Sequence, residues 1–272
     1  MKNISYGNVR QTVANDELAR CVEEIGLRGY TIVKDLIATD ELPGWRHKID
    51  RIYNQQEKVF GREALAAIQE LDICRAPLLY DFEFIKLVIH ERCLNIIRAF
   101  LGDWFVLNLQ NAIITRPGEG HHQSAWHRDL PHQSYVISRP LAINVLLAID
   151  EFSEETGGTQ VLPFTHKSEM LPSESYIDAN RQVAAISAGS AILFDSMLFH
   201  RAGTNRSSST RRGVNQVFTS PIIKQQYDFP RALGAQPGLE PVIARLLGYD
   251  SQVPVDDQMW RKARSERRGK RN

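Results

Sequence analysis

The chain has 272 residues, of which 43% are hydrophobic, and its formal net charge is +1. This length and composition suffice for a single domain with a full hydrophobic core. A charge this close to neutral argues against a general nucleic-acid binder, because phosphate-dominated affinity requires a surplus of lysine and arginine. We therefore expect one domain over residues 1–272 that acts on a small molecule; the composition leaves its oligomeric state open.

The cysteines and the apolar segments bear on the compartment. Cys21, Cys74 and Cys93 lack the spacing of a disulfide framework or of a metal site. No stretch approaches about 18 consecutive apolar residues, and the first eleven residues lack the apolar core of a secretory signal. These features predict a cytoplasmic protein that does not span a membrane.

The first part of the chain, residues 1–103, is predicted to be rich in helix. Apolar residues recur at helical spacing over residues 16–30 and 82–101. A further helix is expected after Asp40, which resembles an N-cap, although Pro43 falls in the first turn. Between these segments, residues 30–36 are short and β-branched, which indicates an extended piece.

From residue 104 onward, short β-type runs such as LAINVLLAID and GVNQVFTSP are separated by the turn signals PGEG, EETGG and SAGS. This pattern is typical of a barrel or jelly roll. We predict a mainly β fold with flanking α-helices, whose core over residues 104–225 is a double-stranded β-helix, the cupin-like jelly roll. Residues 226–272 are expected to form a C-terminal extension that ends in a solvated or disordered basic tail.

A metal-ligand pattern lies within the β-rich part. Residues two apart on a strand face the same side, so His127 and Asp129 can offer an imidazole and a carboxylate to one ion. His200, at the end of the run AILFDSMLFH, can supply a third ligand. Two histidines and one carboxylate form the facial triad of non-heme Fe(II) oxygenases. We therefore predict His127, Asp129 and His200 as the metal ligands.

This pattern has rivals. The chain contains eight histidines and 32 acidic residues, so a single His-x-Asp arises easily by chance. Four other histidines are alternative ligands or substrate contacts: His121, His122, His132 and His166. A zinc hydrolase could also use two histidines and one carboxylate.

A pair of arginines follows the second histidine. An oxygenase that binds a dicarboxylate co-substrate needs a cation for the far carboxylate, and a guanidinium offers a planar fork that matches it. If the strands on either side of residues 202–210 pair antiparallel, Arg211 or Arg212 returns close to His200. A slip of one residue in the register exchanges the two arginines, so the spacing leaves the choice open.

The segments SAWHRDL, EETGGTQVLPFTHKS and HRAGTNRSSSTRR resemble the phytanoyl-CoA dioxygenase family of Fe(II)/2-oxoglutarate-dependent oxygenases, and the resemblance extends over roughly residues 20–225. It implies Fe(II), 2-oxoglutarate and O₂ as cofactor and co-substrates, with His127, Asp129 and His200 as metal ligands. It also implies that Arg211 binds 2-oxoglutarate and that Gln110, on the preceding strand, contacts the co-substrate or the substrate.

The sequence departs from the family pattern at two places. Ala202 stands where some members have a serine that helps to bind the far carboxylate, and the run NVLLAID lacks a tryptophan found in fatty-acyl-CoA members. Asp129 is retained, whereas halogenating relatives replace this carboxylate. We therefore expect hydroxylation of an unactivated C–H bond of a small-molecule metabolite, with release of succinate and CO₂. The alternatives are a cupin-like metal protein or enzyme that has the same triad but does not use 2-oxoglutarate, and a barrel that binds without turnover.

Overall fold

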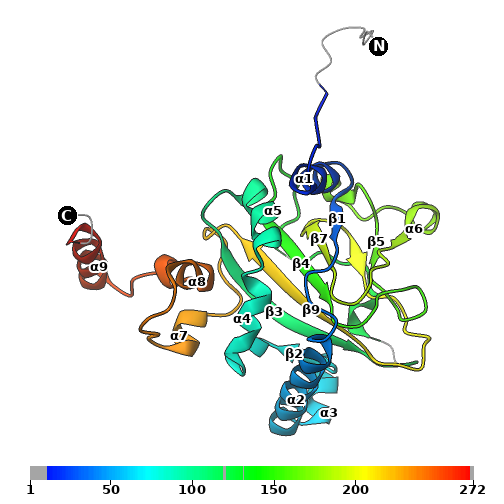
Figure 1. Cartoon of the computed structure of the whole chain (residues 1–272), viewed down its shortest axis with the longest axis horizontal. Helices are drawn as coiled ribbons and strands as arrows, with labels where there is room; N and C mark the ends of the chain where they lie inside the picture. Colours follow the sequence, from blue (N-terminus) through cyan, green and yellow to red (C-terminus); the bar gives the residue numbers. More distant parts are fainter. Residues whose placement is uncertain (1–10, 119–120, 131, 270–272) are drawn as a thin grey trace.

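Two antiparallel sheets form the centre of this computed structural model, which describes residues 11–118, 121–130 and 132–269 (Figure 1). The larger sheet contains, in spatial order, β1 (Tyr30–Val33), β7 (Ala191–Asp195), β4 (Ala142–Ala148), β9 (Arg211–Thr219), β3 (Val106–Thr115) and β2 (Ile73–Arg75). The smaller sheet contains, in spatial order, β6 (Gln182–Val183), β5 (Gln160–Val161) and β8 (His200–Arg201). Both edge strands of the larger sheet, β1 and β2, come from the helix-rich N-terminal part of the chain.

Helices flank the sheets and follow the strands at the C-terminal end. The α-helices are α1 (Glu17–Arg28), α2 (Leu42–Phe60), α3 (Arg62–Ala67), α4 (Ile85–Val88), α5 (Glu91–Leu101), α6 (Glu174–Asn180), α7 (Phe229–Leu233), α8 (Pro241–Leu247) and α9 (Asp257–Gly269). Short 3₁₀ helices cover Pro77–Leu79, Phe82–Phe84, His122–Ser124, Thr165–Lys167 and Tyr249–Ser251. The ends of the predicted domain, residues 1–10 and 270–272, and residues 119–120 of the predicted PGEG turn lie outside the described residues.

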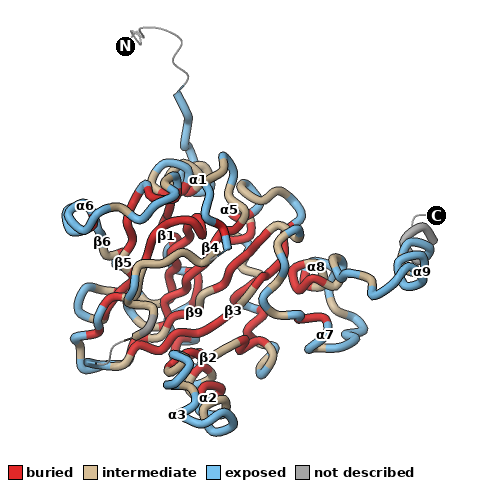
Figure 2. Tube along the Cα trace, turned by 180° about the vertical axis from the view of Figure 1, so that it is seen from behind, coloured by how far each residue is buried: buried red, intermediate tan, exposed pale blue. Residues whose placement is uncertain are grey.

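The strands of the larger sheet are apolar on both faces. On one face, alternate residues of β4 and β7 pack against the helices in the main core. On the other face, Leu146, Ile192 and Phe194 meet Val161 of the smaller sheet. Figure 2 shows that the central strands are almost entirely buried. The predicted mainly β fold with flanking helices is therefore confirmed, as two facing sheets that form no closed barrel within the described ranges.

Local capping sets the ends of the N-terminal helices. The side chain of Asp16 accepts from the backbone N–H of Ala19 and starts α1, and Gly29 ends it at a φ of 94°. The predicted cap of α2 was displaced by one residue, because α2 begins after Glu41 with no side-chain cap, and Pro43 occupies its first turn. Proline is tolerated there since the first-turn N–H groups have no partner within the helix.

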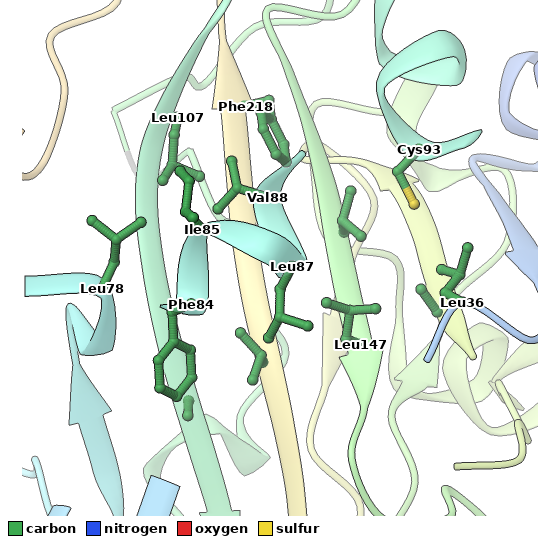
Figure 3. Packing of buried hydrophobic residues seen from close by; sticks show 14 of the residues in the cluster. Leu36, Leu78, Phe84, Ile85, Leu87, Val88, Cys93, Leu107, Leu147 and Phe218 are labelled. Atoms are coloured by element: carbon green, nitrogen blue, oxygen red, sulfur yellow. The ribbon is translucent and has the colours of Figure 1, made fainter. Parts of the chain in front are cut away.

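The helical segment predicted over residues 82–101 is confirmed, but the structure divides it into a 3₁₀ turn, α4 and α5. The carbonyls of Phe84 and Leu87 accept hydrogen bonds from the side-chain amides of Gln110 (3.2 Å) and Gln216 (3.1 Å). The sheet thus binds carbonyls that a continuous helix would use internally. Figure 3 shows the apolar side chains of this segment packed over the sheet, close to Phe218.

The C-terminal extension has two parts. Residues of α7 and α8, among them Phe229 and Leu247, are buried in the main core. By contrast, α9 projects from the body, and its described side chains are exposed except that of Ala263, which is half-buried (Figure 2). Of the solvated or disordered tail that the sequence predicts, residues 257–269 form a helix that is rich in charged residues and largely exposed to solvent. Within the described residues, no helix has both the length and the apolarity needed to cross a membrane.

Candidate active site

A short antiparallel contact between two distant segments brings the predicted histidines together. The backbone N–H of His127 donates to the carbonyl of His200 at 3.0 Å, and the N–H of His200 donates back at 3.1 Å. The two imidazole rings lie 4.4 Å apart between centroids. Because residues directly opposite in such a pair face the same side, the two rings point into the same space between the sheets.

Asp129 completes the group. Its Oδ1 lies 3.7 Å from Nε2 of His127 and 3.6 Å from Nε2 of His200. One ligand atom from each residue lies within 4.8 Å of the others, and this is the one group of His, Cys, Asp or Glu in the described residues that could hold a metal ion. The structure therefore brings together the three residues that the sequence singled out.

Backbone carbonyls orient both imidazoles. Nδ1 of His127 lies 2.9 Å from the carbonyl of Ala125, and Nδ1 of His200 lies 3.0 Å from the carbonyl of Leu198. These distances assign the proton to Nδ1, because a carbonyl only accepts. Each Nε2 then carries a lone pair that faces Asp129, which is the arrangement of imidazoles that bind metals.

The electrostatic environment favours the ligand forms of these groups. Burial lowers the pKa of His200 far below its usual range, which favours the neutral imidazole. For Asp129, burial raises the pKa, but the nearby His200 and His127 and the amides of Asn215 and Asn144 outweigh it and lower the pKa. A neutral imidazole beside an ionised carboxylate is the state that binds a divalent metal.

The register of β3 and β9 distinguishes the two arginines. Arg211 is paired with Thr115, and its guanidinium Nη2 donates to the Thr115 hydroxyl at 2.7 Å. The guanidinium lies 4.4 Å from the centre of the Phe152 ring, its side chain is 4% exposed, and its Nε has no hydrogen-bond partner among the described residues. Burial lowers the pKa of Arg211 to about 10, so the group is still a cation at neutral pH.

Arg212 points the opposite way, toward α2. Its Nε and Nη2 each lie 2.8 Å from a carboxylate oxygen of Asp50, and its Nη1 lies 2.9 Å from Asp150. Because consecutive strand residues face opposite sides, this outward anchoring of Arg212 directs Arg211 inward. The structure thus distinguishes the alternatives that the spacing left open: Arg211 shares the site with the triad.

A single pocket joins these groups. Its empty space is about 430 Å³, including the open mouth. Besides the three residues of the triad and Arg211, its walls are Ile113, Gln123, Leu146, Thr159, Phe194, Arg201, Ala202, Gly213 and Asn215. Gly213 leaves room for Phe152, since a Cβ at this position would lie 2.7 Å from the Phe152 ring. The pocket therefore contains an aligned metal-ligand set and a buried cation that has no carboxylate partner among the described residues.

The structure does not bring Gln110 to this pocket. Its side chain is fully buried on the helix-covered face of the sheet, where it donates to the carbonyl of Phe84. Ile113 and Thr115, of opposite parity on β3, lie on the pocket side. The expected contact between Gln110 and the co-substrate is therefore corrected: its amide holds the segment before α4 on the sheet.

Three polar residues near the triad were missed by sequence reasoning. Asn144 and Asn215 donate to Asp129, and the hydroxyl of Ser196 donates to Asn144. Asn144 is flanked by apolar residues within β4, whereas Asn215 is followed by Gln216 and Ser196 follows Asp195. A polar side chain inside an apolar strand is therefore the signal available for Asn144, because a buried amide needs hydrogen-bond partners.

Comparisons with known proteins agree with this chemistry. The family model described as Phytanoyl-CoA dioxygenase (PhyH) matches residues 27–213. The uncharacterized protein Rv1501 of Mycobacterium tuberculosis is 32% identical over 269 residues, which cover 91% of this chain and 96% of that protein. Dioxygenase andF of Emericella variicolor is 32% identical over 222 residues, 76% of this chain and 70% of that enzyme.

A solved structure shares the fold. EctD from S. alaskensis, determined with 2-oxoglutarate and 5-hydroxyectoine, superposes with a TM-score of 0.61 at 18% identity, over 76% of this chain and 78% of that one. The family model spans more than half of the chain and includes the triad and Arg211. This chain therefore belongs to the phytanoyl-CoA dioxygenase family and is a non-heme dioxygenase that uses Fe(II), 2-oxoglutarate and O₂.

Proposed function

We propose that this enzyme hydroxylates an unactivated C–H bond of a small-molecule metabolite while 2-oxoglutarate is converted to succinate and CO₂. The observation that carries the proposal is the presence, in one pocket, of His127, Asp129, His200 and the buried Arg211. The three residues of the triad would hold the iron, and Arg211 would hold the far carboxylate of 2-oxoglutarate.

The donor set fits Fe(II). Two imidazole nitrogens and one carboxylate oxygen leave other positions of the ion open, which is the arrangement of non-heme iron oxygenases. When bound, the iron supplies the oxidative chemistry with O₂ and 2-oxoglutarate. The contribution of this chain is placement: backbone carbonyls orient the imidazoles, and amide N–H groups orient Asp129.

The buried Arg211 favours an enzyme that uses 2-oxoglutarate over a metal protein that has the same triad but does not use this co-substrate. A buried guanidinium is costly unless an anion accompanies it. The side chain of Arg211 uses one donor on Thr115 and stacks on Phe152, and its Nε has no partner in the described structure. A carboxylate would supply both the charge and the missing acceptors through a bidentate contact, which is stronger in a low-dielectric site.

The retained carboxylate favours hydroxylation. Asp129 occupies the place that halogenation needs for a halide ion, and its hydrogen bonds with Asn144 and Asn215 keep it directed at the histidines.

We also propose that the enzyme acts in the cytoplasm. Cys21, Cys74 and Cys93 are all free and buried, which suits a reducing compartment.

The first test measures succinate formed from 2-oxoglutarate by anaerobically Fe(II)-loaded protein after O₂ is admitted, without an added substrate. We expect slow turnover in the wild type. Arg211→Lys should require much more 2-oxoglutarate, because a planar fork becomes a point charge. Arg212→Lys is the matched control, since Arg212 faces α2, and it should keep the wild-type requirement.

Two results would contradict the proposal. A larger effect of Arg212→Lys than of Arg211→Lys would show that Arg212, and not Arg211, binds the co-substrate. Absence of succinate, together with no thermal stabilisation by 2-oxoglutarate in the presence of metal, would favour a cupin-like metal protein with the same triad. Once uncoupled turnover is established, substrates can be screened by their ability to accelerate it.

A further inference from the structure

Two buried asparagines on neighbouring strands share one oxygen of Asp129. Asn144 lies in β4 and Asn215 in β9, and both side chains are on the pocket side of the larger sheet. Nδ2 of Asn215 lies 3.0 Å from Oδ2 of Asp129, and Nδ2 of Asn144 donates to the same oxygen. The other oxygen, Oδ1, faces the two imidazoles. The two oxygens of this carboxylate therefore have different partners.

A chain of hydrogen bonds fixes the orientation of both amides. The hydroxyl of Ser196 donates to Oδ1 of Asn144, and Nδ2 of Asn144 also donates to Oδ1 of Asn215 at 3.0 Å. These contacts use both N–H groups and the oxygen of Asn144, so the nitrogen end of each amide is directed at Asp129. The backbone carbonyl of Ser196 also accepts from the backbone N–H of Asp129 at 3.2 Å. One network thus holds both the backbone and the carboxylate of Asp129.

Asn144 is the one polar residue of β4, and its contact with Asp129 explains why a polar side chain stands there. The other residues of β4 are apolar and buried, and Asn144 itself is 0% exposed. A buried amide adds little net stability even when it is fully hydrogen-bonded, and an apolar residue of similar shape would suit the strand equally well. The contact with Asp129 therefore gives a functional reason for a polar side chain at this position.

We propose that Asn144 and Asn215 are positioning residues that make Asp129 a one-oxygen metal ligand, an inference that rests on the proposed metal-binding role of Asp129. With Oδ2 occupied by two N–H donors, Oδ1 is the oxygen directed at the ion. A carboxylate that bound through both oxygens would take a further position on the metal. The amide pair keeps that position available for 2-oxoglutarate and O₂.

Titration of the metal-free protein with Co(II) tests this inference without relying on turnover. Asn144→Ala and Asn215→Ala should each weaken Co(II) binding by about ten-fold or more, as is typical when a partner of a metal ligand is removed. They should also change the visible spectrum of bound Co(II), which reports the number and geometry of its ligands. A merely structural role would leave this spectrum unchanged.

Asn108→Ala is the matched control, because Asn108 is also buried and its Nδ2 donates to the carbonyl of Lys224 at 3.0 Å, away from the triad. It should keep the wild-type Co(II) spectrum. If an asparagine variant fails to fold by circular dichroism, Ser196→Ala decides, because it removes only the hydroxyl that orients Asn144. A changed Co(II) spectrum in Ser196→Ala supports the inference, and a wild-type spectrum overturns it.

Asp129→Ala separates the inference from the proposed function. If Asp129→Ala loses Co(II) while both asparagine variants bind it with wild-type affinity and spectrum, the amides have no positioning role and the inference is overturned. If Asp129→Ala itself binds Co(II) as the wild type does, the proposed ligand set fails, and the inference fails with it.

Discussion

Replacing Arg211 with methionine should separate the stability of the metal-free protein from its ability to bind 2-oxoglutarate. Burial lowers the pKa of Arg211 from 12.5 to about 10, and at about 1.4 kcal/mol for each tenfold change this corresponds to an unfavourable burial of about 3 kcal/mol. The hydrogen bond to Thr115 offsets about 1 kcal/mol, and the stacking on Phe152 offsets about 1 kcal/mol more. We therefore expect Arg211→Met to be about 1 kcal/mol more stable than the wild type in the absence of ligands.

Urea unfolding with and without 2-oxoglutarate, with Mn(II) in place of Fe(II), measures both effects. At a 2-oxoglutarate concentration 100 times its Kd, the wild type should gain about 2.7 kcal/mol, and Arg211→Met should gain nothing from it. Arg212→Met is the control: it removes the arginine that pairs with Asp50 and leaves Asp150 paired with Arg46 alone, and we expect a loss of about 2 kcal/mol. The reasoning is refuted if ligand-free Arg211→Met is destabilised as much as Arg212→Met, or if 2-oxoglutarate still stabilises it.

Two further changes test the surroundings of the site. Gly157→Ala should destabilise the protein by about 2 kcal/mol or more, because Gly157 has a φ of 73° and a Cβ there would lie 2.6 Å from the carbonyl oxygen of Gly203. Gly118→Ala, at a φ of 69° with open space around it, measures the backbone strain alone, and equal losses in urea unfolding would exclude a role for the contact. Burial lowers the pKa of His166 to about 4, so the unfolded chain takes up a proton that the folded chain does not as the pH falls from about 6.5 to 4. Stability should be lost over that window, by up to about 3 kcal/mol, and the loss should be smaller in His166→Gln; parallel pH profiles for the two proteins would contradict this.

The residue types and spacing of the triad were sufficient to predict it. The strands differ from the expectation: the apolar strand β7 ends at Asp195, and after a turn His200 begins β8 of the smaller sheet, where it makes an isolated bridge with His127. The residue chemistry nevertheless identified the three side chains that meet. What the sequence could not provide was the register of the strand that follows. Arg212 turns outward because Asp50 in α2 and Asp150 after β4 bind it. Those carboxylates are distant in the sequence, and no local pattern connects them with the arginine.

Gln110 shows why the sequence of β3 does not reveal which of its residues face the pocket and which face the helices. Both faces of this strand are buried, so polar and apolar residues do not alternate as they do on a half-exposed strand. A β-bulge between Leu107 and Leu109 also shifts the pairing with β9 just before Gln110. At the break between α4 and α5, a buried amide of β9 takes part instead, since Gln216 donates to the carbonyl of Leu87.

The pocket side of the larger sheet carries both an apolar packing layer and buried polar and charged groups. Leu146 and Phe194 pack there as an apolar layer, while Asn144, Asn215 and Arg211 place amides and a guanidinium beside it. The asparagines satisfy one another and Asp129 before any ligand arrives, so their hydrogen bonds limit the cost of burial. Arg211 keeps an unused donor instead, which makes its burial unfavourable until an anion binds. The site thus has a preorganised metal-binding half and a half whose stability depends on the co-substrate, so 2-oxoglutarate should stabilise the protein mainly through Arg211.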